Sequence, residues 1–230
     1  MIKFFRHIRQ SLIMNNKTSK YFKYAIGEII LVMIGILLAL QVNNWNEERK
    51  HHKSEKEFYK GIAYDLNQDL EFIRYVRSYT EPKLNVFKRL NTQFPNDYGK
   101  NKTKIDSLLG IYLFSGQRTF YPVSGSFKSA LAGNEINTYS QKNLIQDIIK
   151  LYGSFYDRLI DNGKIIDERW GKLSETYIHN RRVNSFEDIN NSNYISLLDD
   201  FHFHYIQLNW YYNLLNETET EIMKLLKKLK

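Results

Sequence analysis

The N-terminal part of the chain contains one long run of apolar positions. No polar side chain occurs at residues 29–40, and Tyr24 and Trp45 flank the run. An α-helix rises about 1.5 Å per residue, so a run of this length just spans a hydrocarbon core of roughly 30 Å. Tyrosine and tryptophan are enriched at the two membrane interfaces. The pattern therefore predicts a transmembrane helix at residues 24–45.

Two other structures produce a similar pattern, a cleaved signal peptide and a buried core helix. A signal peptide usually has a shorter apolar region that ends in small residues of the A-x-A kind. Here the run ends in LALQVNNW, which offers no such cleavage site. A core helix would carry polar residues along one face, and residues 29–40 carry none. The sequence favours an uncleaved membrane anchor.

After Trp45 the apolar residues recur at steps of three and four, which is typical of packed helices. Neither glycine nor proline occurs between Trp45 and Gly61, so the first helix is predicted to leave the span without a break. Further helices are predicted from near Pro82 to before Pro95, and over residues 103–113, 126–131, 140–177 (capped by Ser140) and 198–229. Residues 115–126 and 180–193 are predicted to be irregular. The predicted fold class is all-α, an N-terminal transmembrane helix followed by an extramembrane helical bundle at residues 46–230.

One face of the predicted span carries small residues. Gly35 and Ala39 have the small-xxx-small spacing that lets two helix backbones approach closely, and Glu28 lies on the same face. A carboxylate within a span is costly and indicates a function. Glu28 could reach the interface and pair with Lys20 or Lys23, form a hydrogen bond across a helix dimer or to a partner's span, or handle protons. A single span with one acid offers no proton pathway, so we predict helix association.

The net charge of +8 is concentrated at the membrane-proximal end. Residues 1–43 contribute +5 and the remaining residues +3. The predicted membrane-surface contacts are the six bases before the span: Lys3, Arg6, Arg9, Lys17, Lys20 and Lys23. Anionic headgroups explain this excess better than nucleic acid, because no DNA- or RNA-binding motif accompanies it. The basic tail at residues 1–23 is compatible with an interfacial amphipathic helix and with a charged retention signal that has no ordered structure.

The same charges bear on orientation. Basic residues also follow the span, so a count of charges barely discriminates between the two topologies. Short basic tails resist crossing a membrane, whereas long downstream domains cross with little regard for their charge. We therefore predict a cytoplasmic N-terminus and a large domain outside the plasma membrane.

The sequence lacks the residues and motifs of several common catalytic sites. It contains no cysteine, which excludes disulfides, cysteine-ligated zinc and thiol catalysis. It also lacks the G-x-S-x-G, P-loop and dinucleotide fingerprints. We predict that the protein is not an enzyme and has no catalytic residue, cofactor site or metal site.

Three pairs of potential metal ligands lack the spacing or the additional ligands that a metal site needs. These pairs are His202 with His204, Asp65 with Asp69, and Glu217 with Glu221. Residues two apart diverge on a helix, so the histidines are interpreted as packing residues. The acid pairs share helical faces but lack the Glu-x-x-His companions of bundle metal sites, so they are interpreted as solvated acidic faces.

The span and its edges resemble a known family. The residues that carry the resemblance read KYxxYAIGEIILVxIGILLALQVNNWNEE, and the match extends over residues 4–49 and more loosely over 127–156. The segment is similar to an uncharacterised single-pass membrane-protein family of Bacteroidota, catalogued as a domain of unknown function. The resemblance implies an inner-membrane protein with a helical extramembrane domain. It implies no activity, cofactor or catalytic residue.

The sequence therefore favours a non-enzymatic, membrane-anchored interaction or scaffold protein. Its expected partners are a lipid bilayer with anionic headgroups and either a second copy of the chain or another membrane protein. The alternative is a ligand-sensing or binding module that works through a partner, because the short tail cannot serve as an output domain. An unrecognised hydrolase ranks third.

Overall fold

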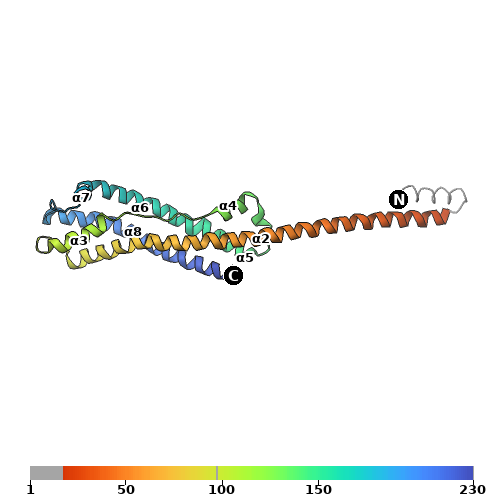
Figure 1. Ribbon diagram of the computed structural model, residues 1–230, viewed down its shortest axis with the longest axis horizontal. Helices are drawn as coiled ribbons and strands as arrows, with labels where there is room; N and C mark the ends of the chain where they lie inside the picture. Colours follow the sequence, from red (N-terminus) through yellow and green to blue (C-terminus); the bar gives the residue numbers. More distant parts are fainter. Residues whose placement is uncertain (1–17, 97, 230) are drawn as a thin grey trace. The chain divides into compact units, whose positions relative to one another are not determined.

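The computed structural model describes residues 18–96 and 98–229 (Figure 1). Every regular element in these two ranges is helical, and no strand occurs there. The all-α prediction is confirmed. The chain divides into two compact units, Met1–Glu55 and Lys56–Lys230.

Helix α2 (Thr18–Gln93) runs through both units without interruption, as predicted from the missing glycine and proline after Trp45. The other elements, in chain order, are η1 (Gly99–Asn101), α3 (Lys102–Leu113), α4 (Gly125–Ala132), η2 (Glu135–Asn137), α5 (Lys142–Lys150), the π-helix η3 (Leu151–Tyr156), α6 (Asp157–Thr176), α7 (Ile178–Val183) and α8 (Asn191–Lys228).

The first unit contains the apolar part of α2. Each of its large apolar side chains between Ile26 and Val42 is at least half exposed. Among the described residues, α2 is the one helix long and apolar enough to cross a membrane. Exposed apolar surface of this extent is unfavourable in water and favourable in lipid.

Pro82 lies inside α2, and the prediction that a second helix starts there was wrong. Proline within a helix removes one backbone hydrogen bond and costs about 3 kcal/mol. Val76 before it and Leu84 and Phe87 after it are all buried in the bundle. Burying each such side chain contributes about 1.5–3 kcal/mol, so the packing on both sides of Pro82 outweighs the lost bond.

The second unit is a helical bundle with two hydrophobic cores. Its long members are the later part of α2, the continuous rod of α5, η3 and α6, and the long helix α8 (Figure 1). The irregular residues 114–124 lead from α3 to α4 and are joined to the long helices by hydrogen bonds from the Phe120 N–H to Tyr211 and from the Val123 N–H to Asp69. The first core includes Phe58, Ile62, Leu66, Ile73, Ile148, Tyr156, Leu215, Ile222 and Leu225. The second core includes Phe87, Leu90, Leu109, Tyr112, Trp170, Leu197 and Phe201.

Two predicted boundaries near the ends of the helices were wrong. Ser140 does not cap the long rod, because α5 begins at Lys142 with Gln141 at its N-cap and no capping side chain. The predicted loop at residues 180–193 is shorter, since α7 covers its beginning and α8 starts at its end. Asn190 starts α8: its side chain accepts hydrogen bonds from the backbone of Ser192 and Asn193 at 2.8 and 3.2 Å. In return the backbone N–H of Asn190 donates to Asn193 Oδ1, which completes a capping box.

Candidate functional site

The predicted association residues Glu28, Gly35 and Ala39 all lie in α2. Because α2 is continuous there, their spacing places them on one face, as the sequence indicated. A Cβ added at Gly35 would meet no atom within 4 Å, so its small size serves no contact in the described part of the chain. Among the predicted membrane-surface residues, Lys20 and Lys23 are in α2, with Lys23 exposed. The other four, Lys3, Arg6, Arg9 and Lys17, lie outside the described residues.

Asp65 and Asp69 do not form a solvated acidic face, and that interpretation was wrong. Both side chains are buried, at 5% and 0% exposure. Asp65 accepts a hydrogen bond from the backbone N–H of Ser126 at 3.1 Å, and Asp69 accepts one from Val123 at 2.8 Å. The two carboxylates thus connect α2 to the end of the irregular segment and the start of α4. Buried backbone N–H groups require a hydrogen-bond partner, and these carboxylates supply it.

The environment of Asp69 disfavours its charge. Burial is the largest influence, and the pKa of Asp69 is raised from 3.8 to about 6. The charge of Asp65 also raises it, whereas the hydrogen bonds from Tyr156 and Val123 lower it. Tyr156 donates its O–H to Asp69 Oδ2 at 2.6 Å, and its own pKa is raised by burial and by that carboxylate. The hydrogen bond between Tyr156 and Asp69 therefore joins η3 to α2 inside the bundle.

Lys83 of α2 is fully buried among aromatic rings. Its Nζ lies 3.2 Å from the ring centroid of Trp170 and 6.0 Å from that of Tyr112, and it donates a long hydrogen bond of 3.4 Å to Gln117. No carboxylate of the described residues pairs with it. Burial, with a smaller contribution from the nearby charge of Arg181, lowers the pKa of Lys83 from 10.5 to about 6. Sequence analysis did not single out this residue.

The two histidines of α8 have separate packing roles. His204 is buried and its Nδ1 lies 2.9 Å from the hydroxyl of Tyr112. Burial lowers the pKa of His204 to about 3, with contributions from the charges of Lys83 and Arg169. Its Nε2 has no hydrogen-bond partner among the residues described. His202 instead stacks on Phe87, with ring centroids 5.4 Å apart. The pair does not converge on one point.

The acids Glu217 and Glu221 are engaged separately on the surface. Glu217 lies 4.0 Å from Arg158, and Glu221 pairs with Lys224 at 2.6 Å. Exposed pairs of this kind contribute about 0–1 kcal/mol to stability. These acids are therefore ordinary surface charges, as the sequence suggested.

A groove of about 370 Å³ lies between α6 and α8. Its lining combines four charged side chains with apolar and polar ones: Ile165, Glu168, Arg169, Lys172, Leu173, Thr176, Asp200, Phe203 and His204. The charges balance, with two bases and two acids. This groove is a candidate binding site, since its walls offer both apolar contact and hydrogen-bond donors and acceptors.

Beside this groove α8 presents a strip of exposed apolar side chains, which we call the α8 ridge. It consists of Phe203, Ile206 and Trp210, which are 61%, 49% and 65% exposed. Their spacing of three and four residues places them on one side of the helix. The guanidinium of Arg169 lies 4.0 Å from the Phe203 ring and donates a hydrogen bond of 3.0 Å to the Phe203 carbonyl. Arg169 therefore packs against the Phe203 end of the ridge, and the side chains of Ile206 and Trp210 are exposed to solvent.

Comparison with known protein families matches residues 28–207 to a family of unknown function, DUF6090. The chain belongs to this family. The match to DUF6090 begins at Glu28 and includes the buried acids, Lys83 and the whole lining of the α6–α8 groove. It confirms the expectation of an uncharacterised domain family. No curated protein and no solved structure matches the chain.

Proposed function

We propose that this DUF6090 chain is a non-enzymatic, single-span protein of the bacterial inner membrane that binds protein partners. In this proposal the N-terminus is cytoplasmic and the helical bundle is periplasmic. The chain acts as a scaffold, associating with a second copy or another membrane protein through its span and presenting the bundle to a further partner.

The α8 ridge is the observation that carries the proposal. Soluble surfaces rarely leave aromatic side chains exposed beside one another, and such strips are enriched at protein interfaces. Phe203 and Trp210 each leave more than half of their surface in water. Aromatic residues and arginine dominate the energies of protein interfaces, and Arg169 already lies against Phe203.

Two strongly perturbed titratable groups support a non-enzymatic role. Asp69 and Lys83 are fully buried, and each is packed within the bundle against its neighbours. A catalytic acid or base must reach a substrate atom directly or through one water. These two groups instead join α2 to the irregular segment and to the aromatic rings around them.

The ridge can be tested with a photocrosslinking amino acid placed at residue 210 in intact cells. We expect adducts of defined mass, and we expect Phe203→Ser to reduce them. The same crosslinker at Tyr64, an aromatic residue of α2 that is 68% exposed, is the matched control. Equal adducts at both positions, or none at residue 210, would overturn the role of the ridge.

Association through the span needs a second experiment. Gly35→Ile adds bulk where no described atom lies nearby, so it can act only on a contact with another molecule. We expect Gly35→Ile and Glu28→Leu to reduce in-membrane crosslinking of the chain. Gly27→Ile is the matched control, because Gly27 is equally open but lies off the predicted face. Unchanged crosslinking in Gly35→Ile refutes association through this face.

Topology can be tested with introduced cysteines, because the chain has none of its own. Lys88→Cys places a thiol on an exposed position of the bundle. A membrane-impermeant maleimide should label it in intact cells whose outer membrane has been made permeable. Labelling only after lysis of the inner membrane would reverse the proposed orientation.

The α6–α8 groove favours a second candidate function, a ligand-binding module that signals through a partner. Its four charged side chains and its volume of about 370 Å³ suit a small zwitterionic molecule. Thermal denaturation in the presence of such compounds distinguishes the two. A ligand-dependent rise in Tm that is lost in Arg169→Gln supports the ligand candidate over the scaffold.

A further inference from the structure

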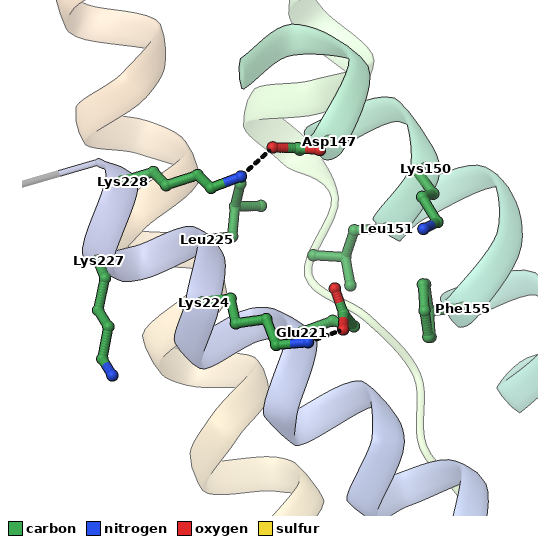
Figure 2. Close-up of a pocket in the computed structure, with 9 residues that line it drawn as sticks. All are labelled: Asp147, Lys150, Leu151, Phe155, Glu221, Lys224, Leu225, Lys227 and Lys228. Atoms are coloured by element: carbon green, nitrogen blue, oxygen red, sulfur yellow. Dashed lines mark hydrogen bonds and ion pairs between the residues drawn. The ribbon is translucent and has the colours of Figure 1, made fainter. Parts of the chain in front are cut away.

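Two grooves beside α8 differ in how their polar side chains are engaged. One of them, of about 330 Å³, lies between the last turns of α8 and the junction of α5 with η3 (Figure 2). Lys224 in its wall pairs with Glu221 at 2.6 Å. Lys228 reaches Asp147 at 2.6 Å, and Lys227 points away from the groove (Figure 2). Most of its charged side chains are therefore already paired within the bundle.

The other groove, between α6 and α8, has a buried polar atom without a partner. His204 of α8 is among the side chains that line this groove, and it is only 1% exposed. Its Nε2 has no hydrogen-bond partner within residues 18–96 and 98–229. Buried polar atoms nearly always have a partner, so a bare nitrogen in the wall of a groove indicates a site for another molecule.

The hydrogen bonds of Tyr112 determine which group Nε2 needs. The Tyr112 hydroxyl lies 3.3 Å from the carbonyl oxygen of Phe201 and 2.9 Å from Nδ1 of His204. This hydroxyl has a single hydrogen, so both bonds form together only if it donates to Phe201 and accepts a proton from Nδ1. The hydrogen-bond network thus assigns the proton of the neutral ring to Nδ1. That tautomer leaves Nε2 as a hydrogen-bond acceptor.

The surroundings of His204 favour an uncharged donor opposite Nε2. Burial lowers the pKa of His204 to about 3, and the charges of Lys83 and Arg169 act in the same direction, so the ring is neutral. The same burial, together with the positive charge of Arg169, disfavours an ammonium group beside the ring. A hydroxyl group is the smallest uncharged donor that a ligand can offer to such a buried atom.

Arg169 supplies the second polar contact of the groove. Its guanidinium lies 4.0 Å from the centroid of the Phe203 ring, and its Nη1 donates to the Phe203 carbonyl at 3.0 Å. The rest of its N–H groups have no partner in the described part of the chain. The acids of the groove are engaged, since Glu168 pairs with Lys172 at 3.2 Å and Asp200 accepts a tyrosine O–H at 2.6 Å. The planar guanidinium group is therefore available for a carboxylate, which it binds well.

We propose that the α6–α8 groove binds a small hydroxycarboxylic acid, with its carboxylate on Arg169 and its hydroxyl donating to His204 Nε2. Ile165, Leu173 and Phe203 provide apolar contact for the carbon skeleton. This binding mode rests on the ligand-binding candidate proposed above and specifies which group meets each end of the ligand. The ammonium group of a zwitterionic ligand lies beside the acids of the groove and away from the histidine.

The test is isothermal titration calorimetry of the full chain in detergent, with pairs of acids that differ by a hydroxyl group. Phenyllactate is compared with phenylpropanoate, and hydroxyisocaproate with isocaproate. A hydrogen bond to an otherwise unpaired buried atom is worth about tenfold in affinity, so each hydroxy acid should bind about tenfold more tightly than its partner. The methyl ether of phenyllactate keeps the oxygen but cannot donate, and it should bind no better than phenylpropanoate.

Two substitutions separate the histidine from the arginine. His204→Phe keeps a ring in the core and removes the acceptor, so the two members of each pair should bind equally. Its matched control is His202→Phe, which changes a histidine that stacks on Phe87 outside the groove and should keep the difference. Arg169→Gln should weaken both members of a pair by about tenfold or more. Arg158→Gln, at an exposed position of α6 outside the lining, should weaken neither.

Three results would overturn the proposed binding mode. Equal affinities within the pairs, or an ether that binds as tightly as phenyllactate, exclude donation to Nε2. These comparisons use the wild type and decide the question even if His204→Phe does not fold. A hydroxyl preference that persists in folded His204→Phe places the donor elsewhere. Absence of binding for every acid overturns the ligand-binding candidate as well, whereas binding without a hydroxyl preference overturns this binding mode alone. The scaffold role is tested separately, by the adducts at residue 210.

Discussion

Replacing Lys83 with methionine should stabilise the protein, because the lysine is buried without a carboxylate. A pKa lowered from 10.5 to about 6 corresponds to about 5 kcal/mol at pH 7. Because the folded-state pKa is about 6, the amine is mostly neutral at pH 7, and the Trp170 face, 3.2 Å from Nζ, offsets little of this cost there. Methionine fills a similar volume and has no charge. We expect Lys83→Met to raise the free energy of unfolding by as much as about 5 kcal/mol at pH 7.

The pH dependence provides a second, sharper readout. The folded-state pKa of Lys83 lies below the unfolded value, so the unfolded chain binds more protons between pH 6 and 10.5. Wild-type stability should therefore rise by about 1.4 kcal/mol per pH unit between pH 7 and about 8.5, below the range in which the buried tyrosines, whose pKa values are raised above 10, act in the opposite sense. The other strongly shifted groups below this range, Asp69 and His204, have folded-state pKa values of about 6 and 3 and titrate mainly below pH 7. Lys83→Met should remove the slope.

The measurement is urea denaturation of the full chain in detergent, followed by the fluorescence of buried Trp170. Lys88→Met, on an exposed position of the same helix, is the control and should keep the wild-type slope. Parallel pH curves for wild type and Lys83→Met would refute the reasoning. A destabilised Lys83→Met with a flat curve would show that the ammonium–indole contact outweighs the burial of the amine.

Four further substitutions test the packing of the irregular segment, two glycines of α6 and the start of α8. Burial raises the pKa of Asp69 from 3.8 to about 6, so this carboxyl group lowers the stability of the wild-type fold as the pH rises through that range, while His204, whose pKa is lowered from 6.5 to about 3, acts in the opposite sense in both proteins. Asp69→Asn should lack this loss, and urea titrations at pH 4.5 and 6.5 that show equal changes in both proteins contradict the assignment. Gly171→Ala in α6 should stabilise by about 1 kcal/mol, because the new Cβ meets no atom within 4 Å. Gly163→Ala should lack that gain in chemical denaturation, because its Cβ would lie 3.2 Å from Thr119 Cβ, and an equal gain refutes the close approach. Asn190→Ala should cost about 1 kcal/mol by removing the cap of α8, and an unchanged Tm would show that the cap contributes nothing.

The apolar stripes of the long helices were predictable from the sequence, because helical spacing is a local property. The apolar residues that recur with helical spacing after Trp45 include Phe58, Ile62, Leu66, Ile73 and Val76, and all five are buried in the first core. The same holds for much of the stripe of α8. Helical periodicity also led to the correct fold class, since it recurs in every long segment.

The buried polar groups depend on contacts between distant segments, which local spacing does not encode. In the sequence Asp65 and Asp69 resemble surface acids. They are buried because residues 123–126 pack over them, and their hydrogen-bond partners Ser126 and Val123 lie 61 and 54 residues away, respectively. Lys83 did carry a local signal. It lies four residues before the buried Phe87, on the apolar stripe of α2, where an exposed lysine is not expected.

The pairing of α2 with α8 determines when the bundle can assemble. The ion pair between Arg77 and Glu219 joins positions 142 residues apart, and the ring stacking of Tyr112 on Phe201 joins the middle of the chain to α8. Both cores therefore stay open until α8 has been synthesised, because loop closure must precede these contacts. Until α8 packs against α2, the apolar stripes of the long helices stay exposed, which makes the partly folded chain prone to aggregation.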